Sequence, residues 1–155
     1  MLYCSAEANS DYQVKTIEKM LIDLGYECTM YPFADSNDLA AITTTAAKES
    51  DVIYVPTDNT VASNTGIIDG ICRPAKIPVV TGEEGICAGC GVATLSIDYY
   101  DLGFATGEMA YKILTGESDI SQMPVEYAPN FSKKYNKEIC DELGIEIPEG
   151  YEAIE

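Results

Sequence analysis

Short apolar segments rich in β-forming residues recur along the first half of the chain, at a spacing of about 25 residues. These segments begin at Leu2, Cys28, Val52 and Ile77. A fifth segment, residues 92–97, follows less regularly. Short apolar runs between polar stretches are typical of strands buried in a sheet. The pattern therefore predicts five main strands in the order in which these runs occur.

Helical periodicity fills the intervals between these runs. The clearest apolar stripe recurs every three to four residues and consists of Val14, Ile17, Leu21 and Leu24. Ser10, with Gln13 three positions later, fits a capping box at the start of this helix, and Gly25 stands where it should end. Weaker stripes over residues 39–46 and 61–71 predict a second and a third helix.

The last third of the chain continues the alternation less evenly. Leu102, Thr106, Met109 and Ile113 predict a long helix that Gly116 ends; a short strand is expected at residues 125–127 and a last helix at 132–143. Strands that alternate with helices form βαβ units, whose right-handed crossovers give a parallel sheet. The predicted fold is α/β, a three-layer, Rossmann-like parallel sheet with helices on both faces.

Composition narrows the class of protein. The 155 residues suit a single domain, 1–155, and 46% of them are hydrophobic, enough for a core. The formal charge of −17 repels phosphate backbones and anionic lipid, so we expect no nucleic-acid partner. The chain has no histidine, which excludes histidine-dependent triads and histidine-ligated metal sites. No apolar run reaches the length of a membrane span.

The loops that follow the predicted strands are polar and almost free of lysine and arginine. In open parallel sheets, ligands bind outside the carboxyl ends of the strands. Amide and hydroxyl groups near Asn9, Ser10 and Thr60 could bind a carboxylate, and an acid such as Asp58 or Glu83 could bind an ammonium group. This combination fits a zwitterion. The same residue types are also ordinary helix N-caps, and the sequence leaves both interpretations open.

Two other kinds of site are weaker candidates. A receiver-type signalling domain has this size and sheet, and Asp58 would be its phosphoacceptor, but no acidic pair ends the first strand and no lysine follows the fifth. Cys87 and Cys90 form a CxxC motif that comes late in the chain and has no matched second pair, so buried free thiols or a simple disulfide are favoured over redox or metal chemistry. No nucleophile stands with a base, and we expect no enzyme.

Several stretches together match one family. The stretches that carry this match are Leu2–Ser10, Asp51–Ser63, Asp98–Gly103 with Gly107, and Ile113–Gly116. Through them the chain resembles the ABC-transporter substrate-binding proteins of the tryptophan/tyrosine type. These are similar to type I periplasmic binding proteins, in which two Rossmann-like lobes clamp an amino acid or another small solute without a cofactor. Gram-positive members are usually lipoproteins outside the membrane, and a transporter permease is their partner.

The resemblance implies what each part of the chain does. It begins in mid-protein, so residues 1–155 correspond to the second lobe plus the return segment, without the first lobe or a leader; no signal peptide is visible. The helix over Tyr99–Thr115 is expected to pack on the first lobe, and without that lobe we expect self-association. The residues that carry over to ligand binding are Glu7, Asn9, Ser10, Asp58, Asn59 and Thr60, with Glu83 as a looser match.

Overall fold

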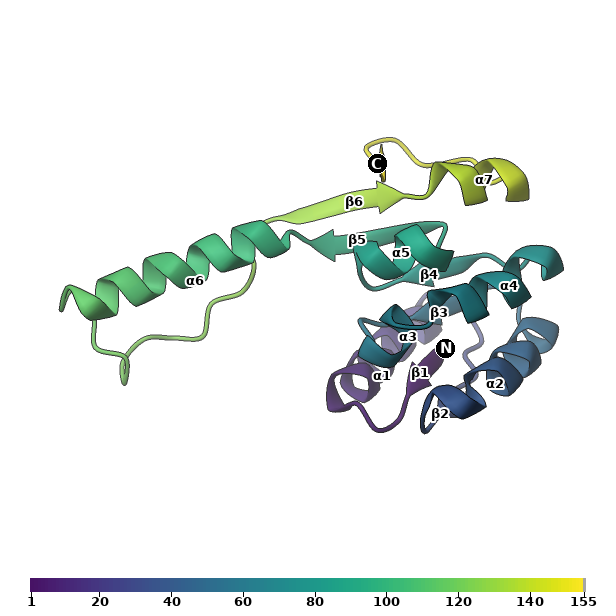
Figure 1. Ribbon diagram of the computed structural model, residues 1–155, viewed down its shortest axis with the longest axis horizontal. Helices are drawn as coiled ribbons and strands as arrows, with labels where there is room; N and C mark the ends of the chain where they lie inside the picture. Colours follow the sequence, from purple (N-terminus) through teal and green to yellow (C-terminus); the bar gives the residue numbers. More distant parts are fainter. Residues whose placement is uncertain (155) are drawn as a thin grey trace. The chain divides into compact units, whose positions relative to one another are not determined.

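The computed structural model describes residues 1–154 and divides into two compact units. The first consists of Met1–Leu95 and the chain from Lys133 onward, and the second is Ser96–Ser132. The first unit holds the sheet and its covering helices, whereas the second is built on one long helix (Figure 1).

Parallel strands form the centre of the first unit. β1 (Leu2–Cys4) pairs with β2 (Tyr31–Phe33), and β3 (Ile53–Val55) pairs with β4 (Val79–Thr81). β4 pairs in turn with β5 (Ala93–Ile97), and the sheet continues in the order β3-β4-β5-β6-β7. β6 is Phe131–Tyr135 and β7 is Glu152–Ala153. β1 also contacts β3, so the two hydrogen-bonded groups of strands adjoin there.

Helices cover both faces of these strands. α1 (Ala8–Asp23) packs on one face, where Val14, Ile17 and Leu21 meet Tyr3 and Tyr54. The other face carries the larger core cluster, to which α2 (Ser36–Glu49), α3 (Asn59–Ala62), α4 (Thr65–Ala75) and α5 (Glu84–Cys90) all contribute. Neighbouring strand residues alternate between the two clusters, as period-two side chains require. The predicted α/β class with helices on both faces is confirmed.

A third, smaller cluster lies under the C-terminal helix. α7 (Lys137–Leu143) buries Ile139 and Cys140 against Val92. The Asn136 side chain caps α7 by accepting a hydrogen bond from Ile139 N–H, and Gly144, with φ of 68°, ends the helix.

The second unit contains α6 (Tyr99–Leu114), whose start Asp98 caps by accepting bonds from the N–H groups of Tyr100 and Asp101. Residues 116–130 run back along α6, and Asn130 Nδ2 donates to Asp101 Oδ2 over 2.7 Å (Figure 1). Within the described chain, no residue from 97 to 132 is buried. The predicted long helix is confirmed, but it has no buried side chain.

Several predicted elements are wrong in detail. The second strand lies at Tyr31–Phe33 rather than 28–31, and residues 125–127 are not a strand. The predicted third helix is in fact two helices. Asp58 is the N-cap of α3, and Asn64 is the N-cap of a second helix, α4. Residues 132–143 are not one helix but part of β6 followed by α7, and α5 was not predicted.

No helix among residues 1–154 is long and apolar enough to cross a bilayer.

Gly82 lets the loops after β3 and β4 approach each other. A Cβ atom there would lie 2.7 Å from Thr57 N and 2.9 Å from Pro56 C, both backbone atoms that cannot turn aside. Gly82→Ala should therefore lower the free energy of unfolding by about 1–3 kcal/mol, measured by urea denaturation. Gly70→Ala is the matched control. A Cβ at Gly70, within α4, meets nothing within 4 Å, so this change should leave stability equal or up to about 1 kcal/mol higher. Equal effects of both substitutions would contradict the close approach.

Candidate functional site

Thr57 connects three segments at the carboxyl ends of the strands. Its carbonyl oxygen accepts from Asn9 Nδ2 over 2.8 Å and from Ser10 Oγ over 3.4 Å. Its N–H donates to Gln13 Oε1 over 3.0 Å, and its hydroxyl donates to the Gly82 carbonyl over 3.3 Å. The start of α1, the loop after β3 and the loop after β4 are therefore fixed to one another.

Glu7 holds the start of α3 with four hydrogen bonds. Its carboxylate accepts from the backbone N–H and side-chain amide of Asn59, over 2.9 and 2.8 Å, and from the N–H and hydroxyl of Thr60, over 2.9 and 2.8 Å. Burial alone would raise the pKa of Glu7, but these bonds outweigh it and lower the pKa to about 2. Glu7 is therefore ionised throughout the physiological range.

Asp58 is the buried acid of this edge, only 1% exposed. One carboxylate oxygen accepts from Cys4 N–H over 2.7 Å and the other from Val61 N–H over 2.9 Å. Both oxygens are thus occupied by backbone donors from β1 and α3. A phosphoacceptor must expose an oxygen to its phosphodonor, so the receiver-type alternative, with Asp58 as the acceptor, is wrong.

Glu83 caps the next helix along the sheet edge. Its carboxylate accepts from the N–H groups of Gly85 and Ile86 at the start of α5. Thr81 Oγ donates to the Glu83 carbonyl over 3.1 Å and steadies the same turn. In residues 1–154, no hydrogen bond joins Glu83 directly to Glu7 or Asp58. Glu83 belongs to the same strand-end edge but to a separate capping group.

The structure brings together most of the residues that the sequence singled out. Hydrogen bonds link Glu7 to Asn59 and Thr60, while Asn9 and Ser10 share the Thr57 carbonyl. We call this group, together with Asp58 and Glu83, the rim. That these side chains contact a ligand is still a prediction.

Sequence reasoning missed Thr57 and misassigned Gln13. α1 begins at Ala8 with Glu7 as N-cap, so the predicted capping box of Ser10 and Gln13 is wrong. Gln13 instead accepts from a backbone N–H 44 residues away. Thr57 uses mainly backbone atoms in these contacts. Its residue type therefore gives no signal that this position connects the three segments.

Among residues 1–154, the donors to the Glu7 and Asp58 carboxylates are all uncharged: backbone N–H groups, one side-chain amide and one hydroxyl. Hydrogen bonds hold these charges in place without neutralising them. Two uncompensated carboxylates at one sheet edge create a negative potential, which the net charge of −17 reinforces. This edge of the sheet therefore attracts cationic groups.

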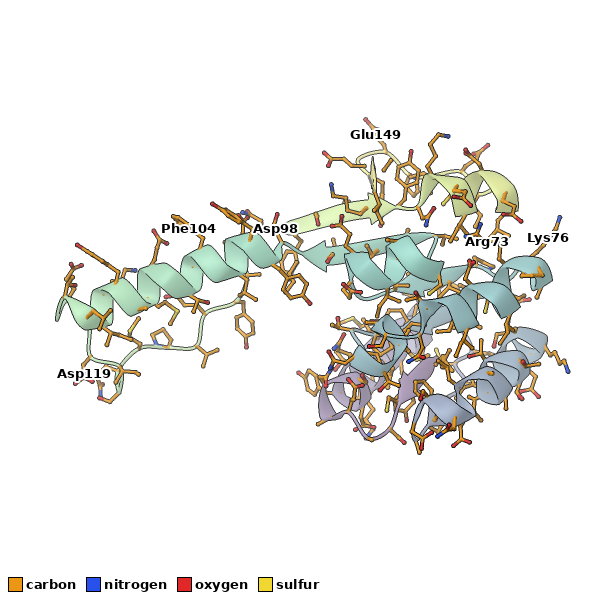
Figure 2. All side chains as sticks on the ribbon, in the orientation of Figure 1. Arg73, Lys76, Asp98, Phe104, Asp119 and Glu149 are labelled. Carbon is orange, nitrogen blue, oxygen red and sulfur yellow. The ribbon has the colours of Figure 1, made fainter. Side chains whose placement is uncertain are left out.

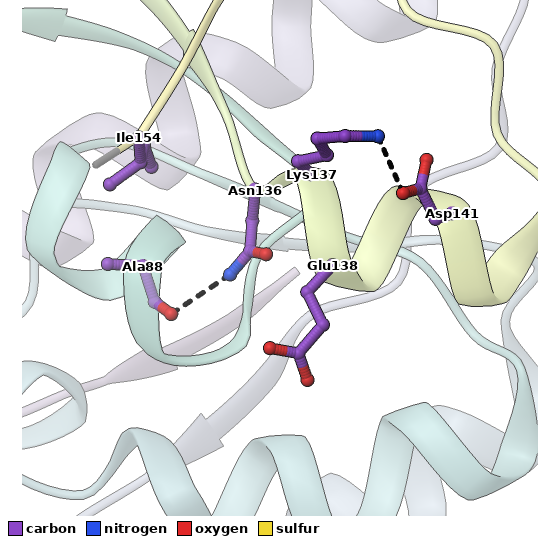
Figure 3. A pocket seen from close by; sticks show the side chains of 6 residues that line it. All are labelled: Ala88, Asn136, Lys137, Glu138, Asp141 and Ile154. Carbon is purple, nitrogen blue, oxygen red and sulfur yellow. Dashed lines mark hydrogen bonds and ion pairs between the residues drawn. The ribbon is translucent and has the colours of Figure 1, made fainter.

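Two hollows lie away from most of the rim. The larger, about 560 Å³, is lined by polar side chains of α7 and its N-terminal turn together with Ala88 and Ile154 (Figure 3). Asn136 Nδ2 donates there to the Ala88 carbonyl, and Lys137 pairs with Asp141 over 2.7 Å. The second, about 370 Å³, lies between α1 and the middle of β3, β4 and β5. None of the seven predicted ligand-binding residues lines either hollow.

The CxxC cysteines are buried within and at the end of α5. Cys87 and Cys90 are both free thiols, like the other four cysteines. Burial raises the pKa of Cys87 to about 11 and that of Cys90 to about 12. A protonated, inaccessible thiol is a poor nucleophile and a poor metal ligand, so this motif is a packing feature. Described residues form no cluster of three or more metal-ligating side chains.

The Glu7 contacts predict an acid-dependent loss of stability. Because the folded-state pKa of about 2 lies below the ordinary value of 4.5, the contribution of Glu7 is complete above pH 4.5 and disappears as the pH falls toward 2. Glu7→Gln should lower the free energy of unfolding by about 1–2 kcal/mol at pH 7 and should reduce the loss between pH 4.5 and 2. Urea unfolding across this range measures both effects.

The exposed Glu27 provides the control for this measurement. Glu27→Gln should leave the stability and its acid dependence close to those of the original chain. If Glu7→Gln and Glu27→Gln have the same pH profile, the four hydrogen bonds do not contribute in solution.

The family model described as ABC transporter substrate binding protein matches residues 1–153. A tyrosine-binding protein of Clostridioides difficile (strain R20291) is 31% identical over 125 residues, which cover 81% of this chain and 36% of that protein.

Solved structures agree with this match. The chain is similar to the ABC domain from Streptococcus pneumonia in complex with L-Trp, with a TM-score of 0.87 and 31% identity over 99% of this chain and 55% of that one. It is also similar to the ligand-free, open structure of a substrate-binding protein with adhesive properties from Clostridium difficile, with a TM-score of 0.78 and 34% identity over 99% and 52%. The chain spans about half the length of these structures. Family members are extracytoplasmic solute-binding proteins without enzymatic activity. This chain belongs to the family of ABC transporter substrate-binding proteins.

Proposed function

We propose that the chain forms one lobe of a solute receptor that delivers an amino acid of the aromatic class to an ABC importer. Its relatives include a tyrosine-binding protein and a domain in complex with L-Trp, which supports this class of ligand. The resemblance to two-lobed receptors, and the coverage of about half their length, support the role of a single lobe. The same proposal includes a permease that the intact receptor binds and a lipid anchor that holds the intact receptor at the membrane.

The observation that carries this proposal is the pair of uncompensated carboxylates beside exposed amides and hydroxyls. Glu7 and Asp58 give the rim its negative potential, which favours the ammonium group of an amino acid. Asn9 and Asn59 are exposed and carry side-chain amides that can donate to the ligand's carboxylate. Both halves of a zwitterion therefore find partners along one edge of the sheet.

The contacts divide the rim residues by role. Asp58 is buried and fully bonded, so in this proposal it positions the loop and does not touch the ligand. Ser10 is also buried, and its hydroxyl faces the Thr57 carbonyl. Asn9 and Asn59 each keep a second side-chain N–H and are the groups that contact the ligand carboxylate, whereas Thr60 donates both its N–H and its hydroxyl to Glu7 and positions that acid. Glu7 and Glu83, both partly exposed, are the acids that attract the ammonium.

A single lobe supplies only part of the contacts of an interlobe cleft. In such receptors the ligand stabilises the closed state by binding both lobes. The isolated chain should therefore bind with a dissociation constant of about millimolar.

An NMR titration of the 155-residue chain with L-tryptophan and L-tyrosine tests the proposal. Amide resonances of Asn9, Asn59 and Thr60 should shift in a saturable way, and L-glutamate should cause smaller shifts because the rim repels an additional carboxylate. Asn59→Ala should weaken the shifts at least about threefold. Asn130→Ala, which removes an exposed amide from the other unit, is the matched control.

The result that would contradict the proposal is equally specific. Saturable shifts confined to either hollow would move the site away from the rim. Micromolar binding by a monomeric chain would show that one lobe is a complete site. Absence of any shift with aromatic amino acids, while another amino acid binds, would overturn the ligand class.

A further inference from the structure

Two side chains of α1 hold one residue of the loop after β3. Gln13 Oε1 accepts from Thr57 N–H over 3.0 Å, and Asn9 Nδ2 donates to the Thr57 carbonyl over 2.8 Å. Gln13 follows Asn9 by four positions, so both project from the same side of the helix. The N–H and the carbonyl belong to the two planar peptide groups that meet at the Thr57 Cα. These bonds therefore fix the loop backbone on both sides of that atom.

The direction of one Asn9 N–H depends on the Thr57 carbonyl. A side-chain amide has two N–H donors on one nitrogen, and Asn9 gives one of them to this carbonyl. Because the amide group is planar, the position of the carbonyl determines where the second N–H points. Asn9 is exposed, and its second N–H is one of the groups that the proposed function assigns to the ligand carboxylate. A displaced carbonyl would turn this donor away from the ligand.

Gln13 fixes the Thr57 backbone from the other end. Pro56 has no N–H, so the N–H of Thr57 is the first backbone donor of the loop. Among the described residues 1–154, Gln13 Oε1 is the acceptor of this N–H. Thr57 is partly buried, and an N–H that loses its acceptor there must turn toward water to avoid the cost of an unmade hydrogen bond. The carbonyl of the same residue would move with it.

The rest of the rim is held by separate contacts. Glu7 is bonded to Asn59 and the start of α3, and Asp58 is bonded to backbone donors of β1 and α3. These bonds do not involve Gln13. Loss of the Gln13 acceptor should therefore displace Asn9 while Glu7 and Asn59 keep their places.

We propose that Gln13 is a positioning residue of the ligand site: through Thr57, it sets the direction in which Asn9 presents its free amide N–H to the carboxylate of an amino acid. This inference rests on the proposed function and adds a residue that does not itself touch the ligand. The role requires an acceptor oxygen at the end of a side chain of this length. Glutamate can supply that oxygen, whereas methionine has nearly the same length and cannot.

NMR spectra of the ligand-free 155-residue chain test the first step. In Gln13→Met the side-chain amide resonances of Asn9 should shift, and those of Asn59 should stay in place. Gln13→Glu should keep the Asn9 resonances close to their original positions. Gln122→Met is the matched control and should move neither amide. Gln122 is an exposed glutamine whose N–H donates to the carbonyl of Asp119, labelled in the second unit in Figure 2.

Titration with L-tryptophan and L-tryptophanamide tests the second step. Both carry the ammonium group and the indole ring, but the amide has no carboxylate. Gln13→Met should raise the dissociation constant for L-tryptophan at least about threefold and leave that for L-tryptophanamide unchanged, because the misdirected donor serves the carboxylate. Gln13→Glu should recover most of the lost affinity for L-tryptophan.

Three results would overturn the inference. Asn9 amide resonances that do not move in Gln13→Met would show that Gln13 does not direct this side chain, whether or not a ligand binds. Equal movement of the Asn9 and Asn59 resonances, or equal loss of affinity for the two ligands, would show a general structural effect. If the original chain binds neither ligand, the proposed function fails, and the ligand-free spectra still decide whether Gln13 sets the direction of Asn9.

Discussion

The buried Asp58 carboxylate joins parts of the sheet that the strand ladders do not connect. β1 and β2 form one hydrogen-bonded pair, and β3 to β7 form the other group. Asp58 follows β3 and accepts from Cys4 N–H at the end of β1 and from Val61 N–H in α3. One side chain thus fixes the distance between the two groups of strands and the direction in which α3 leaves the sheet. Loss of a buried carboxylate of this kind leaves two backbone donors without partners, which is costly away from water.

The same geometry explains why the strand-end edge is negative and yet ordered. Glu7, Asp58 and Glu83 each accept from backbone N–H groups at a helix start, and those donors stabilise negative charge without cancelling it. The fold itself therefore holds the side chains of the rim in place. If the rim binds a solute as proposed, this fixed arrangement reduces the conformational entropy lost on binding.

The alternation of apolar strands and amphipathic helices was enough to predict the α/β class, because buried parallel strands and helix stripes have distinct periods. β6 escaped prediction since Ser132, Lys133 and Lys134 interrupt its apolar pattern. α5 escaped because two of its seven residues are glycines, which are poor helix formers. The strand-end loops identified the residue types of the rim. Their pairing could not be read from the chain, because Glu7 meets Asn59 and Thr60 across more than 50 positions that only the fold brings together.

The six free cysteines can make unfolding irreversible in an oxidising medium. In the folded chain five of them are buried, and burial keeps the Cys72, Cys87 and Cys90 thiols protonated by raising their pKa to about 11 or 12. Unfolding exposes all six thiols at once with ordinary acidity, so in an oxidising medium they form mixed and mispaired disulfides. Outside a reducing compartment, the lifetime of the folded molecule is then set by its rate of unfolding and not by its equilibrium free energy of unfolding.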